Sequence, residues 1–318
     1  MTSSHAGSQH LLVTLLGTYF YGQQKPIPSA FLVRLLGEFG VTEVGARNGL
    51  SRVTKRGLLE VSRPGRSTYY RLSDEAHAHH AERLSEILTF GLDQETWDGT
   101  WTVAMFSVAE RDRAQRHLAR HRLGTMRFAM FYDGVWIRPG SVAEQTVIAL
   151  KDLDLQKATV LSGASVDGVH GPGDPVQAFA LDELELRYRT FVDSLAVLQS
   201  RIEAGEIGAA EALLQRTTVM HQWRYFPDND PLLPSELLPE TWPLTDAHAA
   251  FVSVYDGLGE LADLRLRHLL ADYAPELAAD VRSLTSDEVR AMNIPPRRLG
   301  SLTGMDLADS PLDPDDED

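Results

Sequence analysis

Apolar residues recur at helical spacing in three successive segments near the start of the chain. The first segment ends at the Gly- and Pro-containing stretch 22–28, and its apolar positions are Leu11, Leu12, Leu15, Leu16 and Phe20. The second begins at Ser29, which we expect to cap it, and its apolar positions are Leu32, Leu35, Leu36 and Phe39. Gly40 suits the turn that ends the second segment, and Thr42 suits the cap of a third. The pattern predicts three helices after a disordered tail over residues 1–9.

The third segment, residues 42–56, separates into two faces when its positions are turned by about 100° each. One face is small and apolar and consists of Ala46, Gly49, Leu50 and Val53. The other is polar or basic and consists of Asn48, Ser51, Arg52 and Lys55, with Arg47 at its margin. Arg can donate two hydrogen bonds to guanine and Asn can pair with adenine, so this face fits a DNA major groove. We expect Arg52 and Asn48 to contact bases, and Arg47, Lys55 and Arg56 to contact phosphates. An ordinary solvated helix face is the alternative.

An extended hairpin follows the third segment. Its two strands lie on either side of a Pro-Gly turn at residues 63–66, and the return strand alternates apolar and polar positions. Three helices and a hairpin make a winged helix, which we predict over residues 10–73. Arg63 and Arg66 at the hairpin tip would then reach the DNA backbone or minor groove beside the third helix. The alternative is a surface hairpin with ordinary charged residues.

Charge is distributed unevenly along the chain. Residues 1–72 contain nine Lys and Arg against three Glu, a formal charge of +6, whereas the whole chain carries −15. A basic N-terminal segment followed by an acidic remainder indicates that residues 1–72 bind a polyanionic partner, which we expect to be double-stranded DNA. The absence of cysteine excludes disulfides and thiolate chemistry and suits the cytoplasm. No run of about 18 apolar residues and no secretion signal is present, so we expect no membrane span.

Residues 74–97 predict a polar, mostly helical connector between two domains. They include His77, His79 and His80, of which only His77 and His80 share one helix face. No cysteine or carboxylate is spaced to complete a metal site, so we expect a solvated linker and no bound metal.

The periodicity then changes, and residues 98–168 predict strands and helices in the order βαββαβ, a ferredoxin-like middle domain. Its first helix has a basic face made of Arg113, Arg116 and Arg120, with His117 nearby. This face can contact the flanks of a DNA site, bind an acidic neighbour in a dimer, or simply be solvated.

Glycine and proline are concentrated in residues 166–175, which predicts a linker before a third domain over residues 176–275. Apolar positions at helical spacing in that domain predict an all-helical bundle, with a first stripe of Leu184, Tyr188, Phe191, Leu195, Leu198 and Ile202. Residues 276–318 are expected to be a largely disordered tail, because the stretch from Met305 onward has seven acidic residues and no basic one.

A long segment between the predicted C-terminal helices, residues 220–243, is rich in aromatic, proline and ionisable residues. Its candidate effector-binding residues are His221, Trp223, Arg224, Tyr225 and Trp242, whose rings and cation suit an aromatic acyl thioester. Three other arginines suit a phosphate equally well: Arg187, Arg189 and Arg216. In the alternative interpretation the tryptophans and leucines only fix the loop, while Arg224 pairs with Asp228 or Asp230.

Four stretches of the sequence carry a family resemblance: SAFLVRLLGEFGVTEVGARNGLSRVTKRGLLEVSRPGRSTYYRLS, WDGTW, GVWIRP and DPLLPSELLPETWP. They resemble the PaaX-type repressors of phenylacetate-degradation operons, over about residues 10–275. The resemblance implies a cytoplasmic bacterial regulator with a winged helix, a ferredoxin-like middle domain and a helical C-terminal domain that senses an acyl-CoA. Two positions depart from the family: Leu58, where tryptophan is frequent, and Gly49, a poor helix former that costs up to about 1 kcal/mol.

We therefore expect a multidomain α+β protein that regulates transcription as a homodimer and is not an enzyme. As a repressor of a catabolic operon it would bind an operator in double-stranded DNA. A small effector such as phenylacetyl-CoA or another aryl-CoA thioester would release it, and no cofactor is expected. One alternative is a metal-dependent nuclease that uses Glu110 and Asp112 after the first middle strand. The other is a winged-helix interaction module that binds no DNA.

Overall fold

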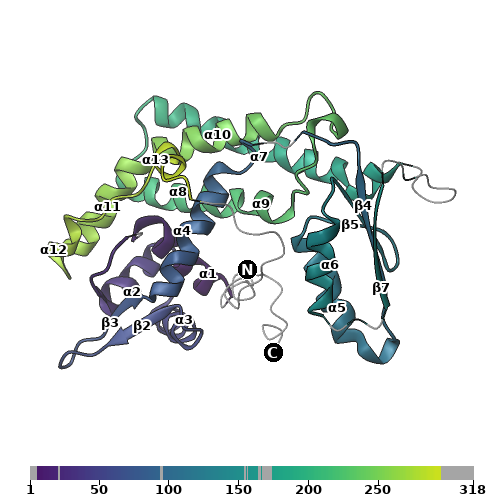
Figure 1. Ribbon diagram of the computed structural model, residues 1–318. Coiled ribbons are helices and arrows are strands. Elements are labelled where there is room, and N and C mark those ends of the chain that lie inside the picture. Colours follow the sequence, from purple (N-terminus) through teal and green to yellow (C-terminus); the bar gives the residue numbers. More distant parts are fainter. Residues whose placement is uncertain are drawn as a thin grey trace.

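In the computed structural model the described residues are 6–20, 22–93, 96–153, 155, 157–163, 166 and 174–294. They form helices and two small antiparallel sheets, which confirms the predicted α+β class. Figure 1 shows the N-terminal elements on one side, the middle elements on the other, and the long C-terminal helices joining the two. The two sheets therefore lie at opposite ends of the molecule.

The N-terminal elements are three helices and a three-stranded sheet: α1 (Ala6–Tyr19), β1 (Ile27–Pro28), α2 (Ser29–Glu38), α3 (Glu43–Lys55), β2 (Leu59–Ser62) and β3 (Tyr69–Leu72). The strands pair in the order β1-β3-β2, and β2 and β3 form the expected antiparallel hairpin. Gly40 has a φ of 78°, which favours glycine. The Thr42 hydroxyl accepts a hydrogen bond from the Gly45 amide at 3.2 Å. Both of these helix signals are confirmed.

Two details of the N-terminal helices correct the expectations from sequence. Ser29 does not cap α2, because Pro28 occupies the capping position and Ser29 is already helical. The expected tail over residues 1–9 is wrong from residue 6 onward, because α1 begins at Ala6 and Gln9 is buried. Since α1 packs against α3 and against helices from later in the chain, these contacts extend the helix beyond its apolar stretch. Residues 1–5 lie outside the described chain.

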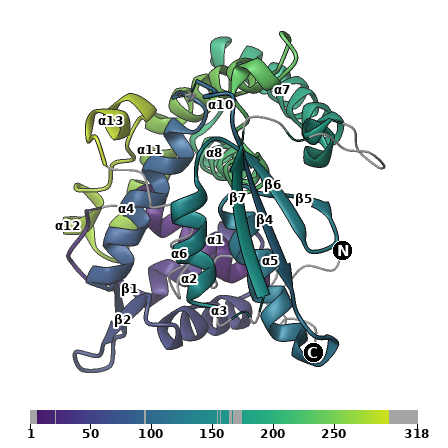
Figure 2. The ribbon, with the colours of Figure 1, turned by 45° about the vertical axis from the view of Figure 1, so that its right-hand side comes forward.

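The connector is helix α4 (Asp74–Thr89), whose N-terminus is capped by the Ser73 side chain. In Figure 2 it runs from the N-terminal sheet up to the C-terminal helices. The expectation of solvated histidines is wrong for His79 and His80, which are 7% and 6% exposed. The reason is that α4 packs against both α1 and a C-terminal helix, so these two histidines are covered as well as its apolar seam.

The middle elements are β4 (Trp101–Ser107), α5 (Arg113–Thr125), β5 (Ala129–Tyr132), β6 (Val135–Pro139), α6 (Ala143–Lys151) and β7 (Lys157–Gly163), with a 3₁₀ turn at Glu110–Asp112. The predicted βαββαβ order is confirmed. The strands pair in the order β5-β6-β4-β7. Helices α5 and α6 cover the face of this sheet that is turned toward the N-terminal elements (Figure 1).

The other face of the middle sheet packs against the C-terminal part of the chain. Trp101, Phe131 and Ile137 of the sheet form one buried cluster with Phe179 and Leu233. Successive residues of a strand point to opposite faces, which is why Trp101 belongs to this cluster while Ala104 packs under the helices. The middle domain is thus fixed through its sheet as well as through the chain.

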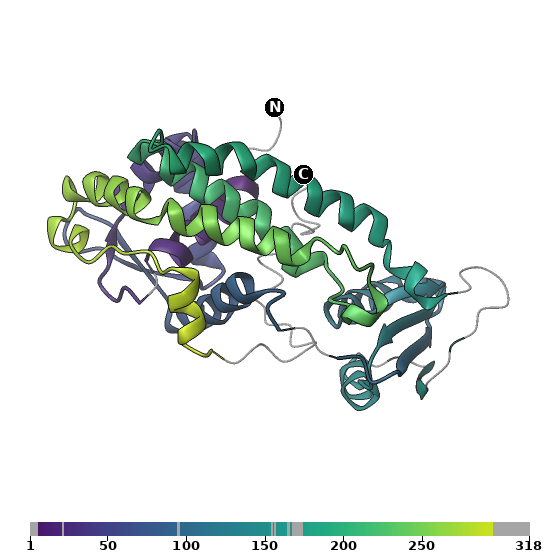
Figure 3. The ribbon, with the colours of Figure 1, turned by 90° about the horizontal axis from the view of Figure 1, so that it is seen from above.

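The C-terminal elements are helical: α7 (Leu181–Glu203), α8 (Ala209–Trp223), α9 (Tyr225–Asn229), α10 (Leu244–Gly257), α11 (Gly259–Ala271), α12 (Pro275–Ala278) and α13 (Ser286–Ala291), with 3₁₀ turns at Pro175–Phe179 and Ser235–Leu237. Figure 3 shows the long helices, coloured teal to green, running side by side between the two ends of the molecule. The expected tail over residues 276–318 is wrong for residues 276–294, because Leu277, Val281 and Val289 are buried there. Residues 295–318 lie outside the described chain.

A single hydrophobic core joins the N-terminal and C-terminal elements. It includes Leu12 of α1, Phe31 of α2, Ile87 of α4 and Phe251 of α10. Ion pairs add to the apolar contact: Glu38 accepts two hydrogen bonds from Arg265 at 2.9 and 2.6 Å, and Lys25 pairs with Asp280 at 2.7 Å. Within the described residues no helix is long and apolar enough to cross a membrane.

Candidate nucleic-acid interface and effector site

The two faces of α3 are separated in the structure as the sequence predicts. Its apolar residues Ala46, Gly49, Leu50 and Val53 are buried. Its polar residues Arg47, Asn48, Ser51, Lys55 and Arg56 are exposed, and Arg52 is half-buried. Gly49 does not interrupt the helix, which is continuous from Glu43 to Lys55. The core therefore holds α3 by one side and leaves a row of donors and cations on the other.

The hairpin packs against α3. Strand β2 contacts α3, and its register with β3 places Leu59 opposite Leu72. The turn between the strands contains Gly65 at a φ of 65°, a conformation that favours glycine. Arg63 and Arg66 on either side of the turn are exposed.

Four cations of this surface have no carboxylate partner among the described residues: Arg52, Lys55, Arg63 and Arg66. Neighbouring arginines differ. Arg71 pairs with Glu60 at 2.7 Å and with Asp74 at 3.0 Å, and Arg47 pairs with Glu43 at 3.3 Å. We name these four residues the head cations. Because they lie in a chain with 45 acidic residues, a surface that keeps carboxylates away from them is suited to an external polyanion.

The five candidate effector residues are not gathered on one surface. Trp223 is 0% exposed, its ring stacks on Phe251 at 4.7 Å, and its indole N–H donates to the Ile87 carbonyl at 2.8 Å. His221 and Tyr225 are exposed, and the Arg187 guanidinium lies 4.7 Å from the Tyr225 ring centre. Trp242 is half-buried against Tyr188. Trp223 therefore holds α8 to α4 and α10, a packing role that the alternative interpretation assigned to it.

Arg224 points inward from the end of α8, away from Tyr225. It is 7% exposed and donates to the Thr14 hydroxyl at 3.1 Å. It lines a cavity of about 30 Å³ between α1, α4 and α8, together with Thr14, His80 and Arg83. Pockets that bury a drug-sized ligand have volumes of about 300–1,000 Å³, so this cavity is too small for an acyl-CoA.

Asp228 and Asp230 join three parts of the chain. Asp228 pairs with Arg83 of α4, which also pairs with Glu86 at 2.8 Å. The carboxylate of Asp230 accepts a hydrogen bond from the Tyr188 hydroxyl at 2.6 Å, and its backbone carbonyl accepts one from Arg127 of the middle domain. Burial raises the pKa of the Asp230 carboxyl. This group is a structural junction between α4, the middle domain and the C-terminal helices.

The nuclease alternative finds no support in the site's geometry. Within the described part of the chain, no group of three His, Cys, Asp or Glu side chains is placed to hold a metal ion. Asp112 lies 3.6 Å from Arg111, and the side chain of Glu110 is not among those described. On the basic face of α5, Arg120 pairs with Asp133 at 3.1 Å and Arg116 donates to the Val108 carbonyl at 3.1 Å.

Three family models match the chain one after another. They describe a PaaX-like protein over residues 7–76, a PaaX protein central Cas2-like domain over residues 94–176, and a PaaX-like protein C-terminal domain over residues 179–268. The chain belongs to the PaaX family. Its central Cas2-like domain contains the whole sheet from β4 to β7.

Two known proteins are similar to this PaaX-family chain. The Transcriptional repressor PaaX of Escherichia coli (strain K12) is 24% identical over 244 residues, which cover 73% of this chain and 74% of that protein. Among solved structures, the Uncharacterized protein Rv0674 from Mycobacterium tuberculosis is 23% identical and has a TM-score of 0.47, covering 82% of this chain and 99% of that chain.

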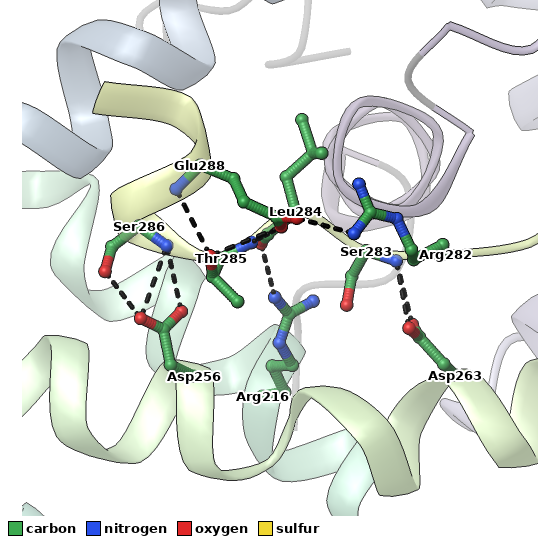
Figure 4. A network of polar contacts seen from close by, with 9 residues as sticks. All are labelled: Arg216, Asp256, Asp263, Arg282, Ser283, Leu284, Thr285, Ser286 and Glu288. Atoms are coloured by element: carbon green, nitrogen blue, oxygen red, sulfur yellow. Dashed lines mark hydrogen bonds and ion pairs between the residues drawn. The ribbon is translucent and has the colours of Figure 1, made fainter. Parts of the chain in front are cut away.

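One polar network in this PaaX-family chain was not identified from its sequence as structural. Arg216 of α8 is 1% exposed and donates to the carbonyls of Tyr255 at 2.9 Å and Leu284 at 3.2 Å. Asp263 accepts the Ser283 amide through both oxygens, and Asp256 accepts the Ser286 amide. Figure 4 shows these side chains converging from α8, α10 and α11 on the segment that leads into α13. Arg216 is thereby unsuited to bind a phosphate, the role that its sequence context left open.

Proposed function

We propose that this chain is a DNA-binding transcriptional regulator, and a repressor, that reads an operator with α3 and the β2–β3 hairpin as a winged helix. The observation that carries the proposal is the row of head cations without carboxylate partners, next to the exposed Asn48 and Ser51. A helix held by its apolar side and offering Arg, Asn and Lys on the other meets the needs of major-groove recognition. Membership of the PaaX family, and the name of the Escherichia coli relative as a transcriptional repressor, support the same function.

Within this proposal the residues divide into two roles. Arg52 and Asn48 contact base edges, while Arg47, Ser51, Lys55 and Arg56 position the helix on the backbone. Arg63 and Arg66 at the hairpin tip reach the adjacent backbone or minor groove. The regulator acts in the cytoplasm as a homodimer, because two winged helices related by a twofold axis match two half-sites and gain affinity together.

Fluorescence anisotropy with a duplex from the upstream region of the chain's own gene tests DNA binding. We expect tight binding at about 50 mM salt that falls steeply as salt increases, because counterions are released from the phosphates. The double variant Arg52→Ala/Lys55→Ala should bind at least about tenfold more weakly. The matched control Arg187→Ala/Arg189→Ala removes the same charge from α7, where both arginines pair with glutamates, and should leave binding unchanged. Equal, salt-insensitive binding by all three proteins would instead support an interaction module.

We further propose that a small effector, phenylacetyl-CoA or another aryl-CoA thioester, binds the C-terminal helices and releases the operator. His221, Tyr225 and Trp242 would contact it, and Trp223 and Arg224 beneath them would change position. This assignment follows the resemblance to PaaX-type repressors; His221, Trp223 and Arg224 lie at the end of α8, and Tyr225 begins α9. A bound effector raises the melting temperature of a protein whose unfolded state does not bind it. Phenylacetyl-CoA should therefore raise the melting temperature, whereas coenzyme A or phenylacetate alone should raise it less, and His221→Ala/Tyr225→Ala should reduce the shift.

A further inference from the structure

The chain that carries the head cations also holds a strongly acidic stretch of sequence. The structure describes the chain as far as Ile294, and 24 residues follow it. Of these, residues 305–318 hold seven acidic side chains and no basic one: Asp306, Asp309, Asp313, Asp315, Asp316, Glu317 and Asp318. We name residues 305–318 the acidic segment.

The acidic segment is long enough to reach the head cations. A chain of 24 residues spans at most about 80 Å when extended. A compact chain of 318 residues has a radius of gyration of about 20 Å. The extended tether is about four times as long as the radius of gyration of the folded chain, so its length permits contact with the head cations.

We propose that the acidic segment binds the head cations within the same molecule and competes with DNA for α3 and the β2–β3 hairpin. The proposal rests on the proposed function, since it makes the DNA-binding surface the docking site. Charge selects this occupant: Arg52, Lys55, Arg63 and Arg66 have no carboxylate partner among the described residues, whereas Arg71 beside them is already neutralised by Glu60 and Asp74. A short tether holds the segment at a millimolar effective concentration, so weak contacts suffice.

Competition of this kind has a defined signature. The segment weakens binding to any duplex by the same factor, because it occupies the surface rather than reading a sequence. That factor must shrink as salt is added, since the intramolecular contact is itself electrostatic and screened. The unmodified protein therefore binds random DNA more weakly than a protein without these acidic charges. The ratio of its affinities for operator DNA and random DNA is unchanged.

The decisive experiment uses the full-length chain with the six aspartates of the acidic segment changed to Asn and Glu317 to Gln. Binding to a labelled 30-base-pair duplex of arbitrary sequence is compared with the unmodified chain, between about 50 and 300 mM salt. We expect the neutral variant to bind about tenfold tighter at the low-salt end, with the difference closing at the high-salt end. A variant with the same residues in shuffled order should behave like the unmodified chain, because charge and not sequence is recognised.

A second measurement locates the contact without DNA. A labelled peptide of residues 305–318 should bind a chain that ends at residue 304, and its affinity should fall when Arg52, Lys55, Arg63 and Arg66 are changed to Ala. The matched control Arg113→Ala/Arg120→Ala/Arg187→Ala/Arg189→Ala removes four exposed cations of α5 and α7 and should leave peptide binding intact. Loss of peptide binding in that control only would overturn the assignment of the site.

The two proposals fail in different ways. If the unmodified and neutral chains bind DNA with the same affinity at every salt concentration, the acidic segment does not compete and the inference is wrong, while the regulator function stands. If neither chain binds any duplex at low salt, the proposed function itself is wrong.

Discussion

At the scale of single residues, Arg216 shows how one buried side chain joins distant parts of the chain. It spans α8, the end of α10 and the segment before α13 through two carbonyl acceptors, and its guanidinium lies 3.7 Å from the Tyr255 ring centre. Arg216→Ala leaves a cavity and two buried carbonyls without a donor, so we expect the free energy of unfolding to fall by about 3 kcal/mol or more. Urea unfolding followed by tryptophan fluorescence measures this. Arg187→Ala, in an exposed pair with Glu183, should change it by less than about 1 kcal/mol.

A second residue, Glu38, makes the contact between α2 and α11 depend on pH. Burial opposes its ionisation, but the hydrogen bonds and charges of Arg265 and Arg34 outweigh that effect and hold the pKa of Glu38 below its ordinary value of 4.5. A lowered folded-state pKa contributes stability that is complete above that ordinary value and is lost as the pH falls through the folded-state pKa. The difference in melting temperature between the unmodified chain and Glu38→Gln should therefore be constant near neutral pH and shrink below about pH 4.5. A difference that stays constant down to pH 3 would contradict this account.

At the scale of elements, α13 is held to the C-terminal helices by backbone amides that donate to carboxylates. Ser283 donates to Asp263, Ser286 donates to Asp256, and Thr285 and Glu288 form a capping box at the start of the helix. In Asp256→Ala/Asp263→Ala these amides lose their acceptors, so we expect hydrogen exchange of residues 281–291 to accelerate by at least about tenfold. Exchange in α7 should stay unchanged. Equal acceleration in both regions would show global rather than local loosening.

The elements also show what the sequence can and cannot predict. The faces of α3, the hairpin and the βαββαβ order were predicted because each depends on local periodicity and turn residues. The burial of His79 and His80 was missed, since it depends on α1 and α13 packing against α4, and no local pattern encodes that. Residues 276–294 were mistaken for a tail because their helices are short and owe their order to contacts with α4 and α11. For the site, exposure of the α3 row was predictable, whereas the inward direction of Arg224 was not.

At the scale of the whole molecule, the segment 231–243 is a docking loop for the middle domain. Leu233 packs against Trp101 and Phe131 of the sheet, and the Trp97 amide donates to Glu236 at 3.3 Å. The segment whose aromatic, proline and ionisable residues predict a ligand site thus also serves interdomain packing. Just before this loop, Asp228 pairs with Arg83 of α4. The middle domain and the helix that follows the hairpin therefore contact the same stretch of the chain, and the orientation of one depends on that of the other.

Because these contacts hold the middle domain in place, we expect that loosening the docking loop frees the middle domain without unfolding it. Leu233→Asp places a charge in a buried apolar cluster, which costs several kcal/mol unless the surfaces separate. Small-angle scattering should then show a larger radius of gyration, and limited proteolysis should cut faster near residues 231–243, while circular dichroism is unchanged. Leu186→Asp, at a position of α7 that is 65% exposed, is the matched control and should alter neither.

If the proposed dimer sets the spacing of two winged helices through this domain, Leu233→Asp should weaken binding to a two-half-site operator but not to a single half-site, because only the former requires a fixed separation.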